Sequence, residues 1–104
     1  MQNKRITHKF RAIRTEFDGI KFASKKECKR YTELLTLKKL EKIQLFLRQT
    51  PFHLAGGVKY ICDFVVFWSD GEVTFEDVKG VKTPVYIAKK KMVEATYGIS
   101  IMEI

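Results

Sequence analysis

Three residues that could do acid–base or metal chemistry lie in two neighbouring segments. Asp63 is the one charged residue in 60–68, a run of apolar, β-branched and aromatic side chains. Asp77 and Lys79 lie near the end of the next segment, 72–79. Carboxylates are rarely fully buried without a partner or a metal ion. Two carboxylates and an ammonium group against an apolar wall therefore indicate a site for a divalent cation or a reacting phosphate.

The two segments are predicted to form an antiparallel hairpin. The run 60–68 is typical of a buried strand, and Asp70-Gly71 is a strong tight-turn dipeptide. Side chains alternate faces along a strand, which places Asp77 and Lys79 on one face of the returning strand and Glu76 on the other. We therefore expect Asp63, Asp77 and Lys79 to meet. Glu76 is the runner-up for Asp77 if a bulge shifts the register.

The flanking elements predict an α/β fold. Asp18-Gly19 indicates an N-terminal hairpin within 10–22, and residues 1–9 are predicted to form a flexible basic arm. A helix over 24–40 is followed by a strand over 43–52, in which Pro51 favours a sheet edge or the end of the strand. The expected core is thus αβββαβ, one domain over 1–104 with a mixed central sheet flanked by helices.

A second helix is predicted to begin at Thr83-Pro84 and to end at Gly98. The terminal strand over 99–104 should then lie parallel to 72–79, because a strand–helix–strand crossover is almost always right-handed and parallel. The apolar residues with helical spacing, expected to pack on the sheet, are Val85, Ala88, Met92 and Ala95.

Glu27 has two interpretations. Ser24-Lys-Lys-Glu27 matches a capping box, which would use Glu27 to close the helix start. On a helical wheel, Glu27 also falls inside the apolar stripe that contains Tyr31 and Leu34. That position points the carboxylate toward the sheet, so Glu27 is both a candidate ligand and a candidate cap.

The charge distribution favours a polyanionic partner. The 104 residues carry a formal net charge of +8, and residues 1–30, with ten Lys and Arg against three acidic residues, account for +7. Basic side chains on the two helices are candidate phosphate contacts, although a solvated helix face has the same appearance. The candidate nucleic-acid-binding residues are Lys25, Lys26, Lys29, Lys89 and Lys91.

Other function classes find little support in the sequence. The two cysteines and two histidines show no spacing typical of a zinc site. No apolar run approaches membrane-spanning length, and the charged N-terminus does not resemble a signal peptide, so we expect a cytoplasmic protein with no membrane partner.

The ordered set of Glu27, Asp63 and Asp77-Val78-Lys79 resembles the PD-(D/E)XK nuclease superfamily, and the wider wording over 22–80 looks like its small phage-type members. Some relatives cut branched DNA such as Holliday junctions, in a bacterial or phage-infected cell. Cys62 stands where the family name has a proline.

The resemblance implies a restriction-endonuclease-like core and a metal-dependent DNA endonuclease. Asp63, Asp77, the Val78 carbonyl and Glu27 would bind Mg²⁺ or Mn²⁺, and Lys79 would orient the attacking water and stabilise charge on the phosphate. The substrate would be duplex or branched DNA. Because one domain has one active site and two strands must be cut, we expect a homodimer with two-fold symmetry.

Alternatives remain open at this point. Asp63 and Lys79 could form only a buried salt bridge, and Glu76-Asp77 could be a solvated strand end. The fold could also serve as a catalytically silent nucleic-acid-binding module, or as a small basic RNA-binding protein. Tyr60, Phe64, Phe67 and Trp68 are interpreted as core residues rather than as base-stacking groups.

Overall fold

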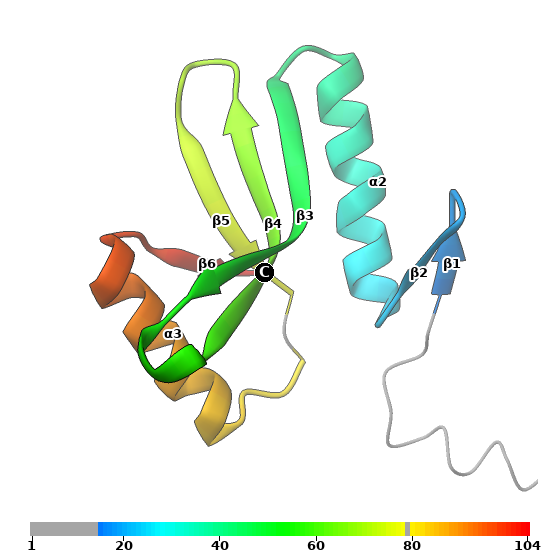
Figure 1. Cartoon of the computed structure of the whole chain (residues 1–104). Coiled ribbons are helices and arrows are strands. Elements are labelled where there is room, and N and C mark those ends of the chain that lie inside the picture. Colours follow the sequence, from blue (N-terminus) through cyan, green and yellow to red (C-terminus); the bar gives the residue numbers. More distant parts are fainter. Residues whose placement is uncertain (1–14, 79) are drawn as a thin grey trace, which may run out of the picture. The chain divides into compact units, whose positions relative to one another are not determined.

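A computed structural model of the chain describes residues 15–78 and 80–104 (Figure 1). The chain divides into two compact units, one ending at Thr36 and the other comprising Leu37–Ile104. The boundary lies within helix α2 (Lys25–Lys39). The predicted basic arm of residues 1–9 lies outside the described residues.

The first unit contains the predicted N-terminal hairpin. Strands β1 (Thr15–Phe17) and β2 (Ile20–Phe22) pair antiparallel. Asp18 and Gly19 join them with φ of 59° and 76°, and positive φ at both central residues is the conformation that suits the right-handed twist of a two-residue hairpin. Asp-Gly therefore specifies this turn, as the sequence indicated.

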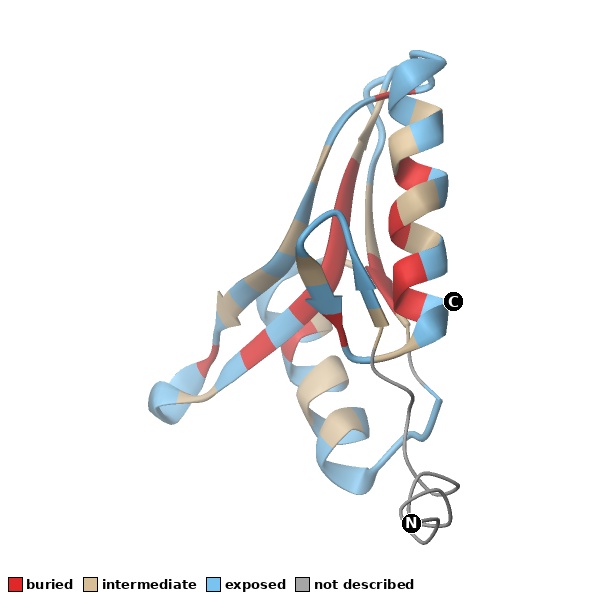
Figure 2. Cartoon of the chain, turned by 90° about the vertical axis from the view of Figure 1, so that its right-hand side faces the viewer, coloured by how far each residue is buried: buried red, intermediate tan, exposed pale blue. Residues whose placement is uncertain are grey.

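Helix α2 begins where the sequence predicted. The Glu27 amide donates to Ser24 Oγ at 3.1 Å, which satisfies one of the unpaired amides of the first turn. Tyr31 packs on Phe22 from the hairpin, with ring centroids 5.1 Å apart, and its hydroxyl donates to Asp18 Oδ2 at 3.5 Å. The buried residues of α2 recur on one stripe (Figure 2): Glu27, Cys28, Tyr31 and Leu34.

The second unit contains the predicted mixed sheet, with strand order β3-β4-β5-β6 (Figure 1). Its strands are β3 (Ile43–His53), β4 (Lys59–Trp68), β5 (Val73–Asp77) and β6 (Ile101–Glu103). The first three pair antiparallel and β6 pairs parallel to β5, as the crossover rule predicted. Pro51 lies on β3, an edge strand of this sheet, where its missing amide has the least effect. A short 3-10 turn (Ala55–Gly57) joins β3 to β4.

Helix α3 (Pro84–Tyr97) connects β5 to β6. Its start is capped by Thr83, whose hydroxyl oxygen accepts from the Tyr86 amide at 3.1 Å, and it ends at Gly98 with φ of 66°. Both ends confirm the prediction, since a Thr-Pro start and a left-handed glycine are typical helix boundaries.

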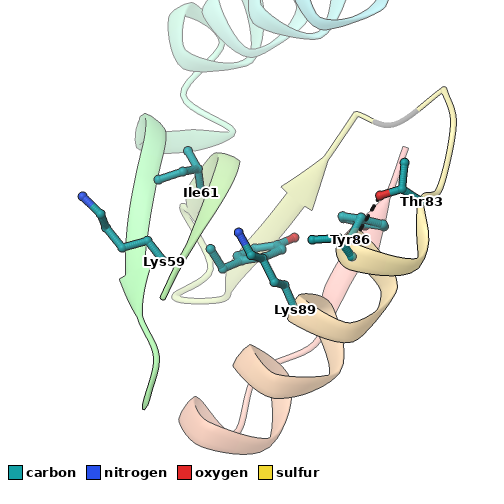
Figure 3. A pocket seen from close by; sticks show the side chains of 7 residues that line it. Lys59, Ile61, Thr83, Tyr86 and Lys89 are labelled. Carbon is teal, nitrogen blue, oxygen red and sulfur yellow. Dashed lines mark hydrogen bonds between the residues drawn. The ribbon is translucent and has the colours of Figure 1, made fainter. Parts of the chain in front are cut away.

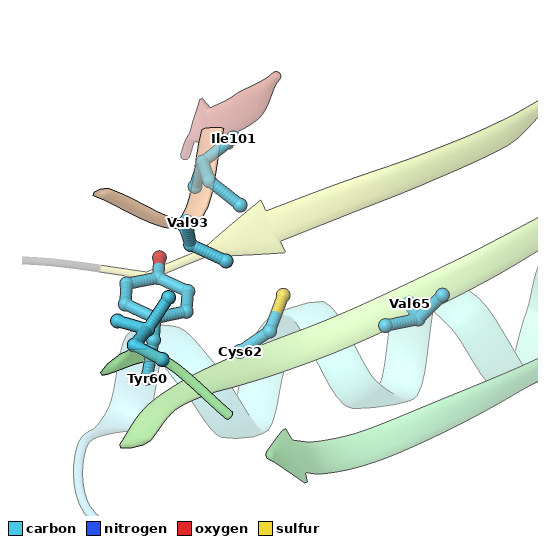
Figure 4. Close-up of a cluster of buried hydrophobic side chains, with 6 residues drawn as sticks. Tyr60, Cys62, Val65, Val93 and Ile101 are labelled. Atoms are coloured by element: carbon cyan, nitrogen blue, oxygen red, sulfur yellow. The ribbon is translucent and has the colours of Figure 1, made fainter. Parts of the chain in front are cut away.

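The face that α3 packs on the sheet differs from the predicted stripe. Val93 is fully buried and belongs to a cluster with Cys62, Val65 and Ile101 (Figure 4). Val85 is instead 64% exposed and Met92 is 39% exposed. The reason is that the half-buried residues beside Val93 include Lys89 and Lys90. The aliphatic stems of lysines can cover an apolar surface, and a pattern of apolar letters alone does not reveal this.

Among the described residues, no helix is long and apolar enough to cross a membrane.

Candidate functional site

Asp63 lies at an irregularity in β4. Cys62 and Val65 both belong to the buried cluster that Val93 joins, although strict alternation would put them on opposite faces. The pairing of β3 with β4 skips Gln49 and Asp63, and Gln49 has a φ of 51°, an uncommon value for a residue other than glycine. The side chains therefore change face at Asp63, although the register of the pairing is the same on both sides of it, with Arg48 opposite Phe64 and Thr50 opposite Cys62.

Hydrogen bonds between backbone amides and carboxylates connect Asp63 on β4 with Asp77 and Val78 at the end of β5. The Asp63 amide donates to Asp77 Oδ1 at 3.0 Å, and the Val78 amide donates to Asp63 Oδ2 at 2.9 Å. Gln49 Nε2 donates to the remaining carboxylate oxygen, Asp63 Oδ1, at 3.0 Å. The two predicted carboxylates are thus brought together where β4 and β5 run side by side.

Asp77 is held from a second direction by Tyr60, whose hydroxyl donates to Asp77 Oδ2. Asp77 is completely buried, whereas Asp63 is 8% exposed. Hydrogen bonds to an ionised carboxylate stabilise it, and a carboxylate oxygen carries two lone pairs, so the same oxygen can accept a hydrogen bond and bind a cation.

Glu76, the runner-up for Asp77, is also buried, with 1% of its surface exposed. The interpretation of Glu76-Asp77 as a solvated strand end is therefore wrong. Glu76 pairs with Phe64 across β4 and β5, one step along the ladder from the Asp63–Asp77 contact. The contact between Asp63 and Asp77 favours Asp77 as the ligand, and the choice between the two acids stays a prediction.

The structure does not test the roles of two predicted site residues, Lys79 and Glu27. Lys79 lies outside the described residues, so both its catalytic role and its salt bridge with Asp63 stay predictions. Glu27 lies in the first unit, where it is 5% exposed and its amide is capped by Ser24. The Ser24 cap accounts for the hydrogen bond of the Glu27 amide. The role of the Glu27 carboxylate as a ligand stays a prediction.

The donor set of Asp63 and Asp77 fits a hard divalent cation. Mg²⁺ commonly binds through one or two carboxylates and completes its octahedral shell with water and substrate phosphate oxygens. Over residues 15–78 and 80–104, no group of three or more His, Cys, Asp or Glu side chains is placed to hold a metal. The shell of a cation here would be completed by water and phosphate oxygens together with the two predicted ligands, the Val78 carbonyl and Glu27.

Cysteine chemistry is disfavoured at this site. Cys62 is completely buried, and its thiol donates to the carbonyl oxygens of Phe64 at 3.3 Å and Glu76 at 3.5 Å. Burial raises the pKa of the Cys62 thiol from about 9.0 to about 11. A neutral thiol is a poor nucleophile and metal ligand, so Cys62 serves packing.

Tyr60 and Gln49 are the contributors to the site that sequence reasoning missed. A buried tyrosine hydroxyl normally finds a hydrogen-bond partner, so Tyr60, three residues before Asp63, carried a usable signal. Gln49 carried none, because its contact with Asp63 depends on a positive φ that the sequence does not indicate.

The candidate nucleic-acid contacts differ in exposure. Lys25, Lys26 and Lys29 are exposed on α2. On α3, Lys91 is exposed and Lys89 is half-buried. Exposure is compatible with phosphate contact and with simple solvation alike, so their role stays a prediction.

Comparison with known proteins gives one match. Residues 7–101 match a family model described as "Protein of unknown function (DUF1064)". The chain belongs to the DUF1064 family. No curated protein and no solved structure matches it. Membership in this family leaves the activity open, so a functional assignment depends on the site itself.

Proposed function

We propose that this member of the DUF1064 family is a divalent-metal-dependent DNA endonuclease that hydrolyses phosphodiester bonds. The observation that carries the proposal is the contact between Asp63 and Asp77. The Asp77 carboxylate accepts a hydrogen bond from the Asp63 amide, and the Asp63 carboxylate accepts one from the Val78 amide, which follows Asp77. The element order α2-β3-β4-β5-α3-β6 and the mixed sheet support a restriction-endonuclease-like core of the PD-(D/E)XK kind.

Each site residue would have its own role in the proposed reaction. Asp63 and Asp77 would hold Mg²⁺ or Mn²⁺, with the Val78 carbonyl and Glu27 as further ligands. The bound ion would supply Lewis acidity toward the phosphate and lower the pKa of a bound water. Gln49 and Tyr60, which hydrogen-bond the two carboxylates, would fix their orientation. Lys79 would orient the attacking water and stabilise the charge that develops on the phosphate.

The partner in this proposal is DNA, either duplex or branched as in recombination intermediates. The net charge of +8 supports a polyanionic substrate, with Lys25, Lys26, Lys29, Lys89 and Lys91 contacting phosphates. One active site per chain would make a two-fold homodimer the arrangement that cuts two strands symmetrically.

A second candidate function is a catalytically silent nucleic-acid-binding module on the same fold. Its support is the complete burial of Asp77, whose two oxygens already accept hydrogen bonds from the Asp63 amide and the Tyr60 hydroxyl. In such a module the carboxylates would stabilise the junction of β4 and β5 and would never bind a cation.

Incubation with plasmid, linear and four-way-junction DNA in Mg²⁺, Mn²⁺ or EDTA separates the two candidates. A nuclease cuts at least one of these DNAs with a divalent ion and none with EDTA, whereas a silent module binds DNA equally in both. A ligand that binds only the folded state raises the melting temperature, so Mg²⁺ or Mn²⁺ should also stabilise the nuclease. If calorimetry detects no divalent binding at millimolar metal, the silent module is the correct function.

A further inference from the structure

A pocket of about 270 Å³ lies between the start of β4 and the first turns of α3 (Figure 3). Lys59, Tyr60 and Ile61 line it from β4, and Val85, Tyr86 and Lys89 line it from α3. The volume is just below the range of about 300–1,000 Å³ that is usual for small-molecule sites. It therefore suits one small unit of a ligand, such as a single base with its sugar.

The two lysines of the pocket are available to an anion. Neither Lys59 nor Lys89 forms an ion pair with any residue that the structure describes. Two nearby lysines behave differently, because Lys82 and Lys90 pair with Glu103 at 2.8 Å and 3.5 Å. Figure 3 shows Lys89 beside the pocket, whereas the Lys59 side chain points away from α3, so Lys89 is the ammonium group placed for a phosphate and Lys59 adds positive charge at the rim.

The surface beside Lys89 is apolar and aromatic. Val85 is 64% exposed on α3, whereas Ile61 points to the face of β4 opposite Tyr60, because side chains alternate along a strand. The Tyr86 ring lies 6.4 Å from the Tyr60 ring, between centroids, with the planes tilted by 31°. Glu103 Oε2 accepts from the Tyr86 hydroxyl at 3.0 Å and so fixes this ring. Such a surface favours contact with the flat face of a base.

Tyr60 connects the pocket to the candidate active site. Its ring lines the pocket, and its hydroxyl donates to Asp77 Oδ2. One side chain therefore separates the pocket from the carboxylate pair. A nucleotide in the pocket and a phosphate at Asp63 and Asp77 could belong to the same strand.

We propose that this pocket binds one unstacked nucleotide of the DNA strand being cut, with its base against Val85 and Tyr86, its phosphate beside Lys89, and Lys59 adding positive charge at the rim. The link to cleavage rests on the proposed nuclease function. A base must leave the helical stack to enter a pocket, and a base that is already unpaired does so at the least cost. The preferred substrates are therefore DNAs with unpaired nucleotides next to the scissile phosphate.

Fluorescence anisotropy with the full-length protein in EDTA tests the pocket without cleavage. The probes are a labelled blunt duplex and the same duplex with a short single-stranded tail of either polarity. We expect one tail polarity to bind about tenfold more tightly than the blunt duplex, the order of effect of one base contact. Val85→Trp fills the mouth of the pocket from an exposed position, and it should remove this preference while retaining blunt-duplex binding. Lys59→Ala combined with Lys89→Ala should also remove it.

The matched control is Lys38→Ala combined with Lys39→Ala, which removes the same charge from exposed positions at the end of α2. This control should keep the preference. Absence of any tail preference in the wild-type protein, or its persistence in Val85→Trp, overturns the pocket assignment even if Mg²⁺-dependent cleavage is observed. A tail preference that Val85→Trp abolishes, in a protein that cuts no DNA with any divalent ion, supports the pocket and overturns the nuclease function.

Discussion

The Asp63 amide donates to Asp77 Oδ1 at 3.0 Å, so the backbone of one candidate ligand orients the carboxylate of the other. The return contact, from the Val78 amide to Asp63 Oδ2 at 2.9 Å, extends the strand pairing beyond the last ladder residues of β5. Two carboxylates so close together repel each other when both are ionised, and a divalent cation relieves that repulsion. Asp63 and Asp77 therefore both connect β4 to the end of β5 and form a candidate metal site.

Asp63→Asn, Asp77→Asn and Lys79→Ala should each abolish cleavage, because each removes a proposed ligand or the group that stabilises the phosphate charge. The measurement is single-turnover cleavage of the best DNA substrate in Mg²⁺, with far-UV circular dichroism to verify folding. Glu76→Gln is the matched control and should be milder than Asp77→Asn. Full activity in any two of the three variants would exclude this site, and a reversed order for Glu76 and Asp77 would exchange their roles.

Tyr60→Phe should lower the free energy of unfolding by about 2 kcal/mol, within the usual range for a hydrogen bond to a charged group, since it removes a donor to the buried Asp77 carboxylate. It should also weaken Mg²⁺ binding in calorimetry, because Asp77 loses a group that orients it. Tyr97→Phe is the control, as its hydroxyl donates to the His53 carbonyl oxygen at an exposed position. Equal effects of the two variants on Mg²⁺ affinity would contradict a positioning role for Tyr60.

The parts of this site that depend on local sequence signals were predictable, and the parts that depend on the tertiary structure were not. Asp63 and Asp77 were predictable because an acid in an apolar strand is exceptional and because Asp70-Gly71 specifies the hairpin that joins them. The exchange of amide hydrogen bonds was not predictable. It depends on the change of face at Asp63 beside Gln49, and strict alternation along β4 gives no sign of it.

Val93→Ala should destabilise the protein by about 2 kcal/mol, because it removes fully buried methyl groups and leaves a cavity. Val85→Ala, at a position that is 64% exposed on the same helix, should change stability by less than about 0.5 kcal/mol. Urea denaturation of both variants measures the two effects. Similar losses from the two substitutions would mean that the predicted stripe of α3, not the observed one, packs on the sheet.

The boundaries of α3 could be predicted from the sequence, whereas the face that it buries could not. Local signals were sufficient for the boundaries of α3, because Thr83, Pro84 and Gly98 act through their own backbone geometry. The buried face depends on a tertiary partner. Lys89 and Lys90 are half-buried beside Val93, and a hydrophobicity pattern counts such lysines as solvent-facing even when their stems cover the sheet.

The buried thiol of Cys62 predicts a loss of stability at alkaline pH. Its pKa is about 11 in the folded protein and about 9.0 when exposed, so above pH 9 the unfolded state releases the proton while the folded state retains it. Stability from this group is therefore complete below pH 9 and declines as the pH rises toward 11. Urea denaturation across this window should show a smaller decline for Cys62→Ala than for the wild-type protein. Identical slopes would mean that other groups cause the decline.

Replacing Lys25, Lys26 and Lys29 together with alanine should weaken binding to unrelated DNA sequences about equally and flatten its salt dependence. Each phosphate contact releases counterions, so each lost contact should reduce the slope of log affinity against log salt by about 0.9. Anisotropy titrations of duplex DNA at several salt concentrations measure this slope. A triple alanine variant at Lys38, Lys39 and Lys42 removes the same charge from other exposed positions and is the control. If both triple variants flatten the slope equally, the effect comes from total charge; if the first retains the wild-type slope, the start of α2 is only solvated and DNA approaches elsewhere.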